Sequence, residues 1–331
     1  MGTKRRDFIA VLGGAAVMPF AARAQQPEQV RRIGVLMSLA ANDPEGQGMS
    51  AAFVQGMSQL GWNQGSNLHI EWRWAAGDGE RLRTYAAELA TLRPDVILLN
   101  GTPALTAVRQ HSQTTPIVFV NVGDPVGSGL IASLARPGGH ITGFTNYEYS
   151  MGGKWLELLK EVTPRVTRCL AVFNSENATH NGLLQAVEAA SSSAAIRLAP
   201  LDISNPSNIE AAVDNFAKEE NGGLIVLPDF RTTTYRDRII DSAARNNLPG
   251  VFPFRSFAIS GGLLAYAVDS FELYRRGAAS YADRILRGST PEELPVQAPT
   301  KFELVINLKT ATALGLTVPP TLLARADEVI E

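Results

Sequence analysis

The sequence predicts an α/β protein with two lobes, each built on its own parallel sheet, joined by three extended crossings. Three observations predict this class. The chain has 331 residues, which is long for one hydrophobic core and sufficient for two. Short apolar runs alternate with helical patterns, as they do in βα units. This alternation starts again after a segment rich in glycine and proline, at 136–145.

The first lobe is predicted from four strands with helices between them. The predicted strands are 32–37, 68–74, 95–99 and 116–121, and the predicted helices are 48–60, 80–92 and 102–111. Most of these strands are nearly continuous apolar runs, which is typical of parallel strands covered by helices on both faces. The strand at 68–74 instead alternates apolar and polar residues, as a half-buried strand does.

The second lobe repeats the architecture without repeating the sequence. The predicted strands are 168–173, 198–203, 223–227 and 250–254, and the predicted helices are 152–161, 181–191, 208–219 and 234–246. Each lobe therefore has enough strands for a sheet of the usual size.

Three segments are predicted to cross between the lobes: the extended part of 136–145, then 261–268, then 294–299. The amphipathic helix 271–286 lies between the last two crossings and is expected to return to the first lobe. The first lobe then comprises 31–145 plus 268–296, and the second comprises 146–267 plus 297–331. Two lobes tied in this way can close on a ligand about a hinge.

The first 24 residues are expected to be a cleaved export signal. Lys4–Arg6 is basic, Phe8–Ala22 is apolar, and Ala22-Arg23-Ala24 fits a cleavage site before Gln25. The apolar run is too short for a membrane anchor. Arg5–Ile9 resembles a twin-arginine signal, with an ordinary secretory signal as the alternative. Without a cysteine near the cleavage site, we expect a soluble periplasmic protein with no lipid anchor.

Composition and motifs argue against several function classes. A formal net charge of -2 does not fit a nucleic-acid partner. The four histidines are scattered without metal-ligand spacing, and the single Cys169 lies in an apolar run. The usual hydrolase, zinc-protease and phosphate-loop motifs do not occur, and neither Gly46-Gln47-Gly48 nor Gly127-Ser128-Gly129 has the third glycine of a dinucleotide site. We therefore expect no catalytic residues, no metal and no cofactor.

Several motifs resemble those of a known family. They are Asp124-Pro125-Val126, Arg136-Pro137-Gly138-Gly139-His140-Ile141-Thr142-Gly143, Asn307-Leu308-Lys309-Thr310-Ala311, Leu314-Gly315-Leu316 and Pro319-Pro320. In this order, over about 32–326, they resemble the ABC transporter substrate-binding family related to the tryptophan-binding lipoprotein. The resemblance implies a type I periplasmic-binding fold, with two Rossmann-like lobes, a three-stranded hinge and a ligand in the cleft. It also implies an ABC permease in the inner membrane as partner. Many relatives are lipoproteins, whereas this chain has no lipidation cysteine.

Candidate ligand-binding residues follow the predicted strands, because ligands of open α/β sheets bind beyond the carboxyl ends of the strands. In the first lobe they are Ser38, Asn42, Gly101, Thr102, Pro103 and Asp124. Thr102 is expected to cap a helix with Pro103 at its first position, which would present free N–H groups to a carboxylate. For Asp124 the alternative is a cap or turn role.

In the second lobe the candidates are Asn174, Glu176, Asp229, Phe254, Arg255 and Tyr266. Asp229 is suited to a ligand ammonium group, and Phe254 with Tyr266 to an apolar or aromatic body. Arg255 could bind an acid group in bidentate fashion. The alternatives are a cap for Asp229 and core packing for Phe254.

The sequence thus predicts a monomeric solute-binding protein of an ABC importer, closing on an amino acid or an aromatic or carboxylate compound. Two other functions stay open. The same fold would serve a sensor that docks on a membrane receptor. An exported oxidoreductase is also compatible, since twin-arginine export often carries folded cofactor proteins.

Overall fold

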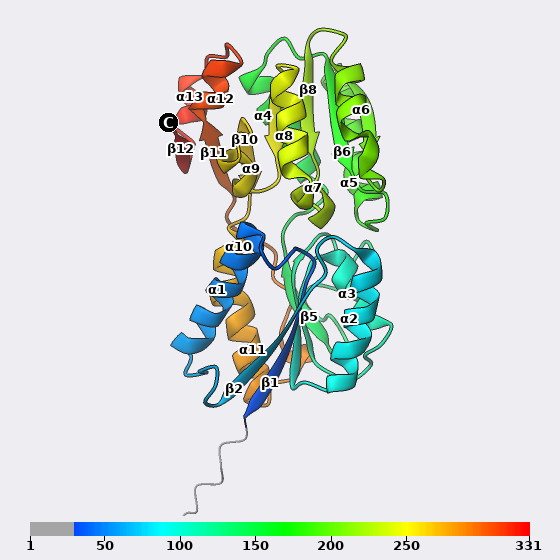
Figure 1. Cartoon of the computed structure of the whole chain (residues 1–331), viewed down its shortest axis with the longest axis vertical. Coiled ribbons are helices and arrows are strands. Elements are labelled where there is room, and N and C mark those ends of the chain that lie inside the picture. Colours follow the sequence, from blue (N-terminus) through cyan, green and yellow to red (C-terminus); the bar gives the residue numbers. More distant parts are fainter. Residues whose placement is uncertain (1–29) are drawn as a thin grey trace, which may run out of the picture.

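Two lobes lie end to end along the long axis of the computed structural model (Figure 1), which describes residues 30–331. The predicted export signal, 1–24, lies outside the described residues. One sheet with its helices forms the lobe coloured mainly blue and cyan, and a second sheet forms the lobe coloured green to red. The predicted α/β fold with two parallel-sheet lobes is confirmed.

The first sheet has five strands in the order β2-β1-β3-β4-β5, all parallel. They are β1 (Arg31–Met37), β2 (Leu68–Trp74), β3 (Val96–Asn100), β4 (Ile117–Val122) and β5 (Ile141–Thr145). The helices that follow β1, β2 and β3 are α1 (Pro44–Gln59), α2 (Gly79–Leu92) and α3 (Thr102–Arg109). α1 begins four residues before the predicted start because the Asp43 side chain accepts a hydrogen bond from the Glu45 N–H and caps it.

Helices cover both faces of this sheet. On one face α1 packs with a π-helical segment, η2 (Leu273–Ala278), and with α11 (Ala279–Leu286) in one apolar cluster. α2 and α3 share a second cluster with the opposite side chains of the strands. Gly56 lets α1 approach η2, because a Cβ at that position would lie 2.1 Å from the Arg275 carbonyl oxygen. A segment late in the sequence therefore completes the core of the first lobe.

The second sheet has seven strands in the order β12-β11-β10-β9-β8-β6-β7. They are β6 (Arg168–Phe173), β7 (Arg197–Asp202), β8 (Gly222–Val226), β9 (Gly250–Phe252), β10 (Leu264–Ala267), β11 (Glu303–Asn307) and β12 (Glu328–Ile330). Its helices and turns include α4 (Met151–Val162), α5 (His180–Ser193), α6 (Ile209–Phe216), α7 (Phe230–Thr234), α8 (Arg236–Arg245), α9 (Arg255–Ile259), α12 (Leu308–Ala313) and α13 (Pro320–Leu323). Short segments complete the chain: η1 (Pro206–Asn208), α10 (Ser270–Glu272) and η3 (Pro291–Glu293).

Three details differ from the sequence prediction. The segment 261–268, predicted as a crossing, instead contributes β10 to the second sheet, where it pairs in parallel with β9 and antiparallel with β11. The crossing follows β10. The helix predicted at 234–246 corresponds to α8, which begins two residues later, after Tyr235, and the short helix α7 before it was not predicted. β11 and β12 were not predicted, and the antiparallel pair means that the second sheet is mixed.

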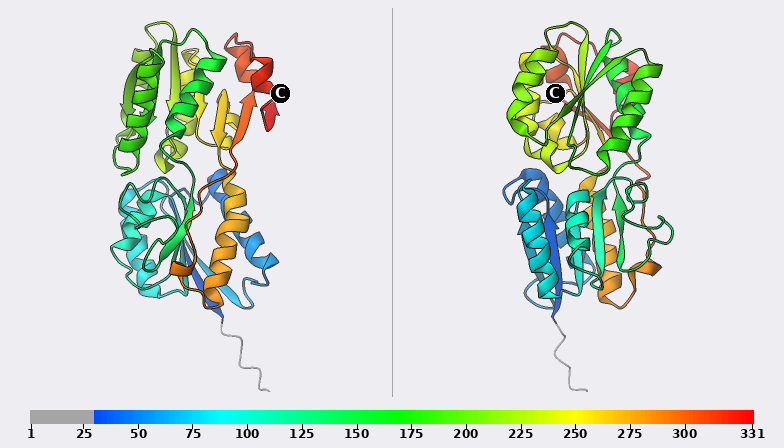
Figure 2. Two further views of the ribbon diagram at one scale, coloured as in Figure 1. Left: turned by 180° about the vertical axis from the view of Figure 1, so that it is seen from behind. Right: turned by 90° about the vertical axis from the view of Figure 1, so that its right-hand side faces the viewer.

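Two of the crossings are hydrogen-bonded to each other. The Thr145 N–H donates to the Gln297 carbonyl oxygen at 2.9 Å, and the Gln297 N–H donates to the Gly143 carbonyl oxygen at 3.0 Å. Figure 2 shows the later segment rising beside the earlier one between the lobes. Since both run between the same two sheets, the lobes are joined by a short paired ribbon and by the chain that follows β10.

No helix in the described part of the chain is both long enough and apolar enough to span a bilayer. Within residues 30–331, no cluster of three or more histidine, cysteine or acidic side chains is arranged to hold a metal ion.

Candidate functional site

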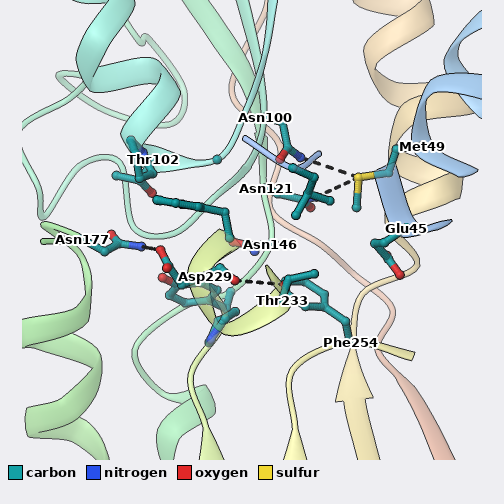
Figure 3. Close-up of a pocket in the computed structure, with 16 residues that line it drawn as sticks. Glu45, Met49, Asn100, Thr102, Asn121, Asn146, Asn177, Asp229, Thr233 and Phe254 are labelled. Atoms are coloured by element: carbon teal, nitrogen blue, oxygen red, sulfur yellow. Dashed lines mark hydrogen bonds between the residues drawn. The ribbon is translucent and has the colours of Figure 1, made fainter. Parts of the chain in front are cut away.

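A small pocket lies where the carboxyl ends of the two sheets face each other. Figure 3 draws 16 residues that line it, taken from both lobes and from the crossing after β5. Its free volume is about 40 Å³. Since one water molecule needs roughly 10–15 Å³ of such space, the pocket as it stands is smaller than an amino acid.

The start of α3 forms one wall of the pocket. Gly101, not Thr102, is the cap residue; its φ is +86° and no side chain caps the helix. The prediction that Thr102 caps α3 is therefore wrong, because the helix already begins at Thr102 and Pro103 is its second residue. The first backbone hydrogen bond of α3 runs from the Leu105 N–H to the Gly101 carbonyl oxygen. The N–H groups of the preceding residues have no partner within the helix and lie at the positive end of its dipole, which favours an anionic ligand group.

Asn100 is the last residue of β3 and Asn121 is the second-last residue of the neighbouring β4, and both line the pocket beside this helix. The Asn100 Nδ2 donates to the Tyr274 hydroxyl at 2.9 Å and lies 3.6 Å from the Met49 sulfur. Asn121 has a φ of +59°, where the register between β4 and β5 shifts. A bulge of this kind re-aims a side chain, here toward the pocket. Burial of Tyr274 raises its pKa, so its hydroxyl stays protonated as a hydrogen-bonding partner of Asn100.

The second lobe contributes Asp229, which is buried and caps α7. Its Oδ1 accepts hydrogen bonds from the Asn174 Nδ2 at 3.0 Å and the Arg231 N–H at 2.8 Å. Its Oδ2 accepts one from the Asn177 Nδ2 at 2.9 Å, drawn in Figure 3. These three donors are two side-chain amides and one backbone N–H, and none of them carries a charge. A carboxylate oxygen accepts more than one hydrogen bond, so Oδ2 retains capacity for a ligand.

His180 fixes the loop that carries these amides. Its Nδ1 accepts a hydrogen bond from the Asn174 N–H at 2.9 Å, and its Nε2 lies 3.1 Å from the Pro228 carbonyl oxygen. Burial lowers the pKa of His180, against the opposing charge of Asp229. A neutral ring with its proton on Nε2 satisfies both contacts, so His180 ties the end of β6 to the end of β8.

The crossing after β5 supplies Asn146 and Tyr147. Asn146 is 6% exposed, and its Oδ1 has no hydrogen-bond partner within the described residues. Buried acceptors are rarely left unpaired, and this one belongs to a residue that lines the pocket. The Tyr147 hydroxyl lies 2.8 Å from the Thr179 Oγ1, which anchors its ring to the second lobe.

Glu45, in the first turn of α1, lines the opposite side of the pocket from Asp229 (Figure 3). It is 7% exposed and makes no ion pair among residues 30–331. Burial raises the pKa of Glu45 and the charge of Asp43 adds to this, while the Ser256 hydroxyl and two arginines oppose it. Those arginines, Arg236 and Arg255, are paired with other carboxylates.

Five of the predicted site residues line the pocket: Gly101, Thr102, Pro103, Asp229 and Phe254. Two more, Asn174 and Glu176, line the wider groove that opens outward from it between α2, α3 and the second lobe. Glu176 pairs there with Arg231 at 2.6 Å. Whether these residues bind ligand stays a prediction.

The other five predicted site residues do not line this pocket. Ser38 is buried beneath it and donates to the Asn100 carbonyl oxygen at 2.6 Å, and Asn42 is exposed. Asp124 is committed to a turn, where it accepts from the Gly127 N–H at 2.9 Å.

Arg255 and Tyr266 are engaged within the second lobe. Arg255 forms a two-point ion pair with Glu328, with distances of 2.6 and 2.7 Å. The Tyr266 ring stacks on Phe302 with centroids 5.5 Å apart. Both residues lie near the cleft in the fold, but their side chains contact Glu328 and Phe302 and do not line the pocket.

Several lining residues were absent from the sequence prediction: Glu45, Met49, Asn100, Asn121, Asn146, Tyr147, Asn177 and Thr233. A signal existed for two of them, since Asn100 and Asn121 are polar residues at or next to the ends of apolar strands. Met49 and Asn146 have no such signal in the sequence. Met49 reaches the cleft from one face of α1, and Asn146 reaches it from the crossing after β5.

A family model described as ABC transporter substrate binding protein matches residues 35–330. The chain belongs to this family. Membership confirms the resemblance seen in the sequence motifs, and it makes the protein a substrate-binding protein and not an enzyme. A curated relative, the tyrosine-binding protein of Clostridioides difficile (strain R20291), is 23% identical over 264 residues, 80% of this chain and 75% of the relative.

Two solved structures of similar proteins differ in their likeness to this substrate-binding protein. An ABC domain in complex with L-Trp from Streptococcus pneumonia has a TM-score of 0.84 at 22% identity, covering 91% of this chain and 99% of that one. A ligand-free, open substrate binding protein from Clostridium difficile has a TM-score of 0.66 at 21% identity, with the same coverage. Identity and coverage are nearly equal for the two structures, whereas the TM-scores differ.

Proposed function

We propose that this chain is the solute-binding component of an ABC importer and that it captures an aromatic amino acid in the cleft between its lobes. One observation carries the proposal. The start of α3 in the first lobe and the Asp229 carboxylate in the second lobe face the same pocket, so they can hold the carboxylate and the ammonium of one α-amino acid.

The remaining walls suit an apolar side chain. Leu39 and Met49 come from the first lobe, and Phe230 and Phe254 come from the second. Aromatic and sulfur-containing side chains of this kind pack well on an aromatic ring. Two similar proteins, the tyrosine-binding protein and the ABC domain in complex with L-Trp, have aromatic amino acids as ligands, which supports the same class here.

Hinge closure is part of the proposal. The lobes, residues 31–145 with 268–296 and residues 146–267 with 297–331, would separate to admit the ligand and close around it. The small free volume of the pocket and the greater likeness to the L-Trp complex than to the open protein support a closed arrangement in this structure. A ligand that touches both lobes binds the closed state better and shifts the population toward it.

We further propose that the mature protein works in the periplasm and delivers its ligand to an inner-membrane permease. The basic, apolar and small-residue pattern of 1–24 supports export. Cell fractionation of the full-length chain tests this location, and a variant with Arg5 and Arg6 changed to lysine tests the twin-arginine route.

The ligand class is tested by isothermal titration calorimetry. The protein is first unfolded, dialysed to remove any bound ligand and then refolded. L-Trp, L-Tyr and L-Phe are titrated beside L-Glu, L-Lys and D-Trp. We expect binding of one or more aromatic L-amino acids, accompanied by a rise in melting temperature through mass action. Binding of L-Glu or L-Lys in preference to every aromatic amino acid would contradict the proposal, as would equal binding of L-Trp and D-Trp.

A further inference from the structure

The pocket has two acidic groups at opposite ends. In Figure 3, Thr102, Asn177 and Asp229 lie on one side and Glu45 and Met49 on the other. In the described part of the chain, the lining includes no lysine, arginine or histidine. If the head group of an amino acid occupies the side of Asp229, its side chain points toward Glu45.

Glu45 has no ion-pair partner in the described part of the chain, because the two arginines near it are paired with other carboxylates. Arg236 is 2.7 Å from Asp43, and Arg255 is 2.6 Å from Glu328. Both arginines are therefore neutralised by other carboxylates. A buried carboxyl group without an ion-pair partner is costly, and a fold that keeps one next to a ligand cavity is stabilised when the ligand supplies a hydrogen bond.

The surroundings of Glu45 favour a neutral donor over a cation. Met49 and Phe254 line the pocket beside Glu45 (Figure 3), and neither side chain carries an oxygen or nitrogen that could bind an ammonium or guanidinium group. Arg236 and Arg255 act on Glu45 from nearby, so a cationic ligand group would be repelled by two like charges. A ring N–H or O–H needs one acceptor and keeps the rest of its ring in apolar contact.

We propose that Glu45 is a specificity-determining residue, accepting a hydrogen bond from a donor on the far edge of an aromatic amino acid. This inference rests on the proposed function and narrows the ligand to aromatic amino acids with an N–H or O–H on the ring, such as L-Trp or L-Tyr, against L-Phe. A site built to hydrogen-bond a ligand group rejects the analogue that lacks it, because its own polar group is then left unpaired.

The test compares Kd values by calorimetry for L-Trp, L-Tyr, L-Phe and L-Lys with the wild type and two variants. Glu45→Gln keeps an acceptor oxygen without the charge, and Glu45→Met removes the acceptor at similar size. The matched control is Glu80→Met, because Glu80 holds the same second position in α2 that Glu45 holds in α1 and is exposed.

For the wild type we expect L-Phe to bind at least about tenfold more weakly than the better of L-Trp and L-Tyr, the loss of one hydrogen bond to a charged group. Glu45→Met should bring this ratio to within about threefold of unity, mainly by improving L-Phe, and Glu45→Gln should give an intermediate ratio. Glu80→Met should keep the wild-type ratio.

The outcomes separate the inference from the proposed function. If the wild type binds none of the aromatic amino acids, both fail. If it binds L-Phe as tightly as L-Trp and L-Tyr, or binds L-Lys best, the role of Glu45 is overturned. If circular dichroism shows that Glu45→Met does not fold, the test rests on Glu45→Gln. A ratio of Kd values equal to that of the wild type in this variant then overturns the role of Glu45.

Discussion

Asp43 in the first lobe and Arg236 in the second form an ion pair across the cleft, with the Arg236 Nη1 2.7 Å from the Asp43 Oδ2. Each side chain is only 12% exposed. The same Arg236 nitrogen donates to the Thr233 carbonyl oxygen at 3.1 Å, and Thr233 lines the pocket. The pair therefore joins the lobes directly beside the pocket, and separation of the lobes would break it.

Replacing this arginine should favour the open arrangement. We expect Arg236→Ala to increase the radius of gyration of the ligand-free protein in small-angle X-ray scattering. It should also weaken ligand binding by about tenfold, since the closed state loses a contact that the open state does not have. Arg238→Ala is the matched control on the same helix, because Arg238 pairs with Glu210 within the second lobe. If Arg236→Ala and Arg238→Ala have the same radius of gyration and the same ligand affinity, the ion pair between Asp43 and Arg236 does not stabilise the closed state.

Removing the charge of Asp229 should weaken ligand binding more than it weakens the fold. Asp229→Asn keeps the size and a cap acceptor for α7, but it loses the carboxylate that would face an ammonium group. We expect Kd to rise by about tenfold to a hundredfold, which corresponds to a hydrogen bond between charged groups. Calorimetry gives the affinity. Asp202→Asn, an exposed carboxylate held by Ser175 and Ser204, should leave Kd unchanged, and a loss of equal size there would refute the assignment.

Stability should depend on the titration of Glu45. Burial raises the pKa of this carboxyl above its ordinary value of 4.5, so the folded protein binds the proton more tightly than the unfolded chain does. Its contribution to the free energy of unfolding is therefore fully present below pH 4.5 and is lost as the pH rises through the raised pKa. Each tenfold difference in proton affinity between the folded and unfolded states corresponds to about 1.4 kcal/mol of this contribution.

Glu45→Gln should remove this dependence. We expect the melting temperature of the wild type, relative to Glu45→Gln, to increase as pH is lowered from about 7.5 to about 5 in ligand-free protein. Thermal unfolding in steps of pH provides the measurement. A difference between the two melting temperatures that stays constant over this range would show that Glu45 does not titrate there.

Two glycine-to-alanine changes should have opposite effects. A Cβ at Gly123 would lie 2.1 Å from the Tyr147 ring, whereas one at Gly153 in α4 would meet Ala190 at 3.8 Å. We expect Gly123→Ala to destabilise the fold by about 1–3 kcal/mol through overpacking. Gly153→Ala should stabilise it by about 0.5–1 kcal/mol through helix propensity. Urea denaturation measures both, and a tolerated Gly123→Ala would mean that Tyr147 has room to move.

The elements of the fold that could be predicted are those whose burial is uniform. β3 and β4 are continuous apolar runs, and the structure has them within one residue of the predicted bounds. β11 was missed although Leu304-Val305-Ile306 is a buried apolar run. Its antiparallel pairing with β10, about 40 residues earlier, is a tertiary contact that no local pattern indicates.

Prediction of the site succeeded where a strand end and a helix start coincide. Gly101–Pro103 and Asp229 line the pocket because each closely follows a buried strand. Arg255 follows a strand just as closely, yet Glu328 binds it, and nothing near Arg255 in the sequence indicates that partner. Glu45 lines the pocket because α1 starts there and its first turn faces the opposite lobe.

The sequence by itself determined the α/β class, the two lobes, the family and the loops from which a ligand site could be built, because periodicity and short motifs are local properties of the chain. Only the tertiary structure decided which polar side chains share the cleft and which are already paired. Charge pairs such as Asp43 with Arg236 across the lobes, and Arg255 with Glu328 within the second lobe, join residues far apart in sequence. These pairings leave Glu45 and Asp229 as the acidic groups that face the pocket.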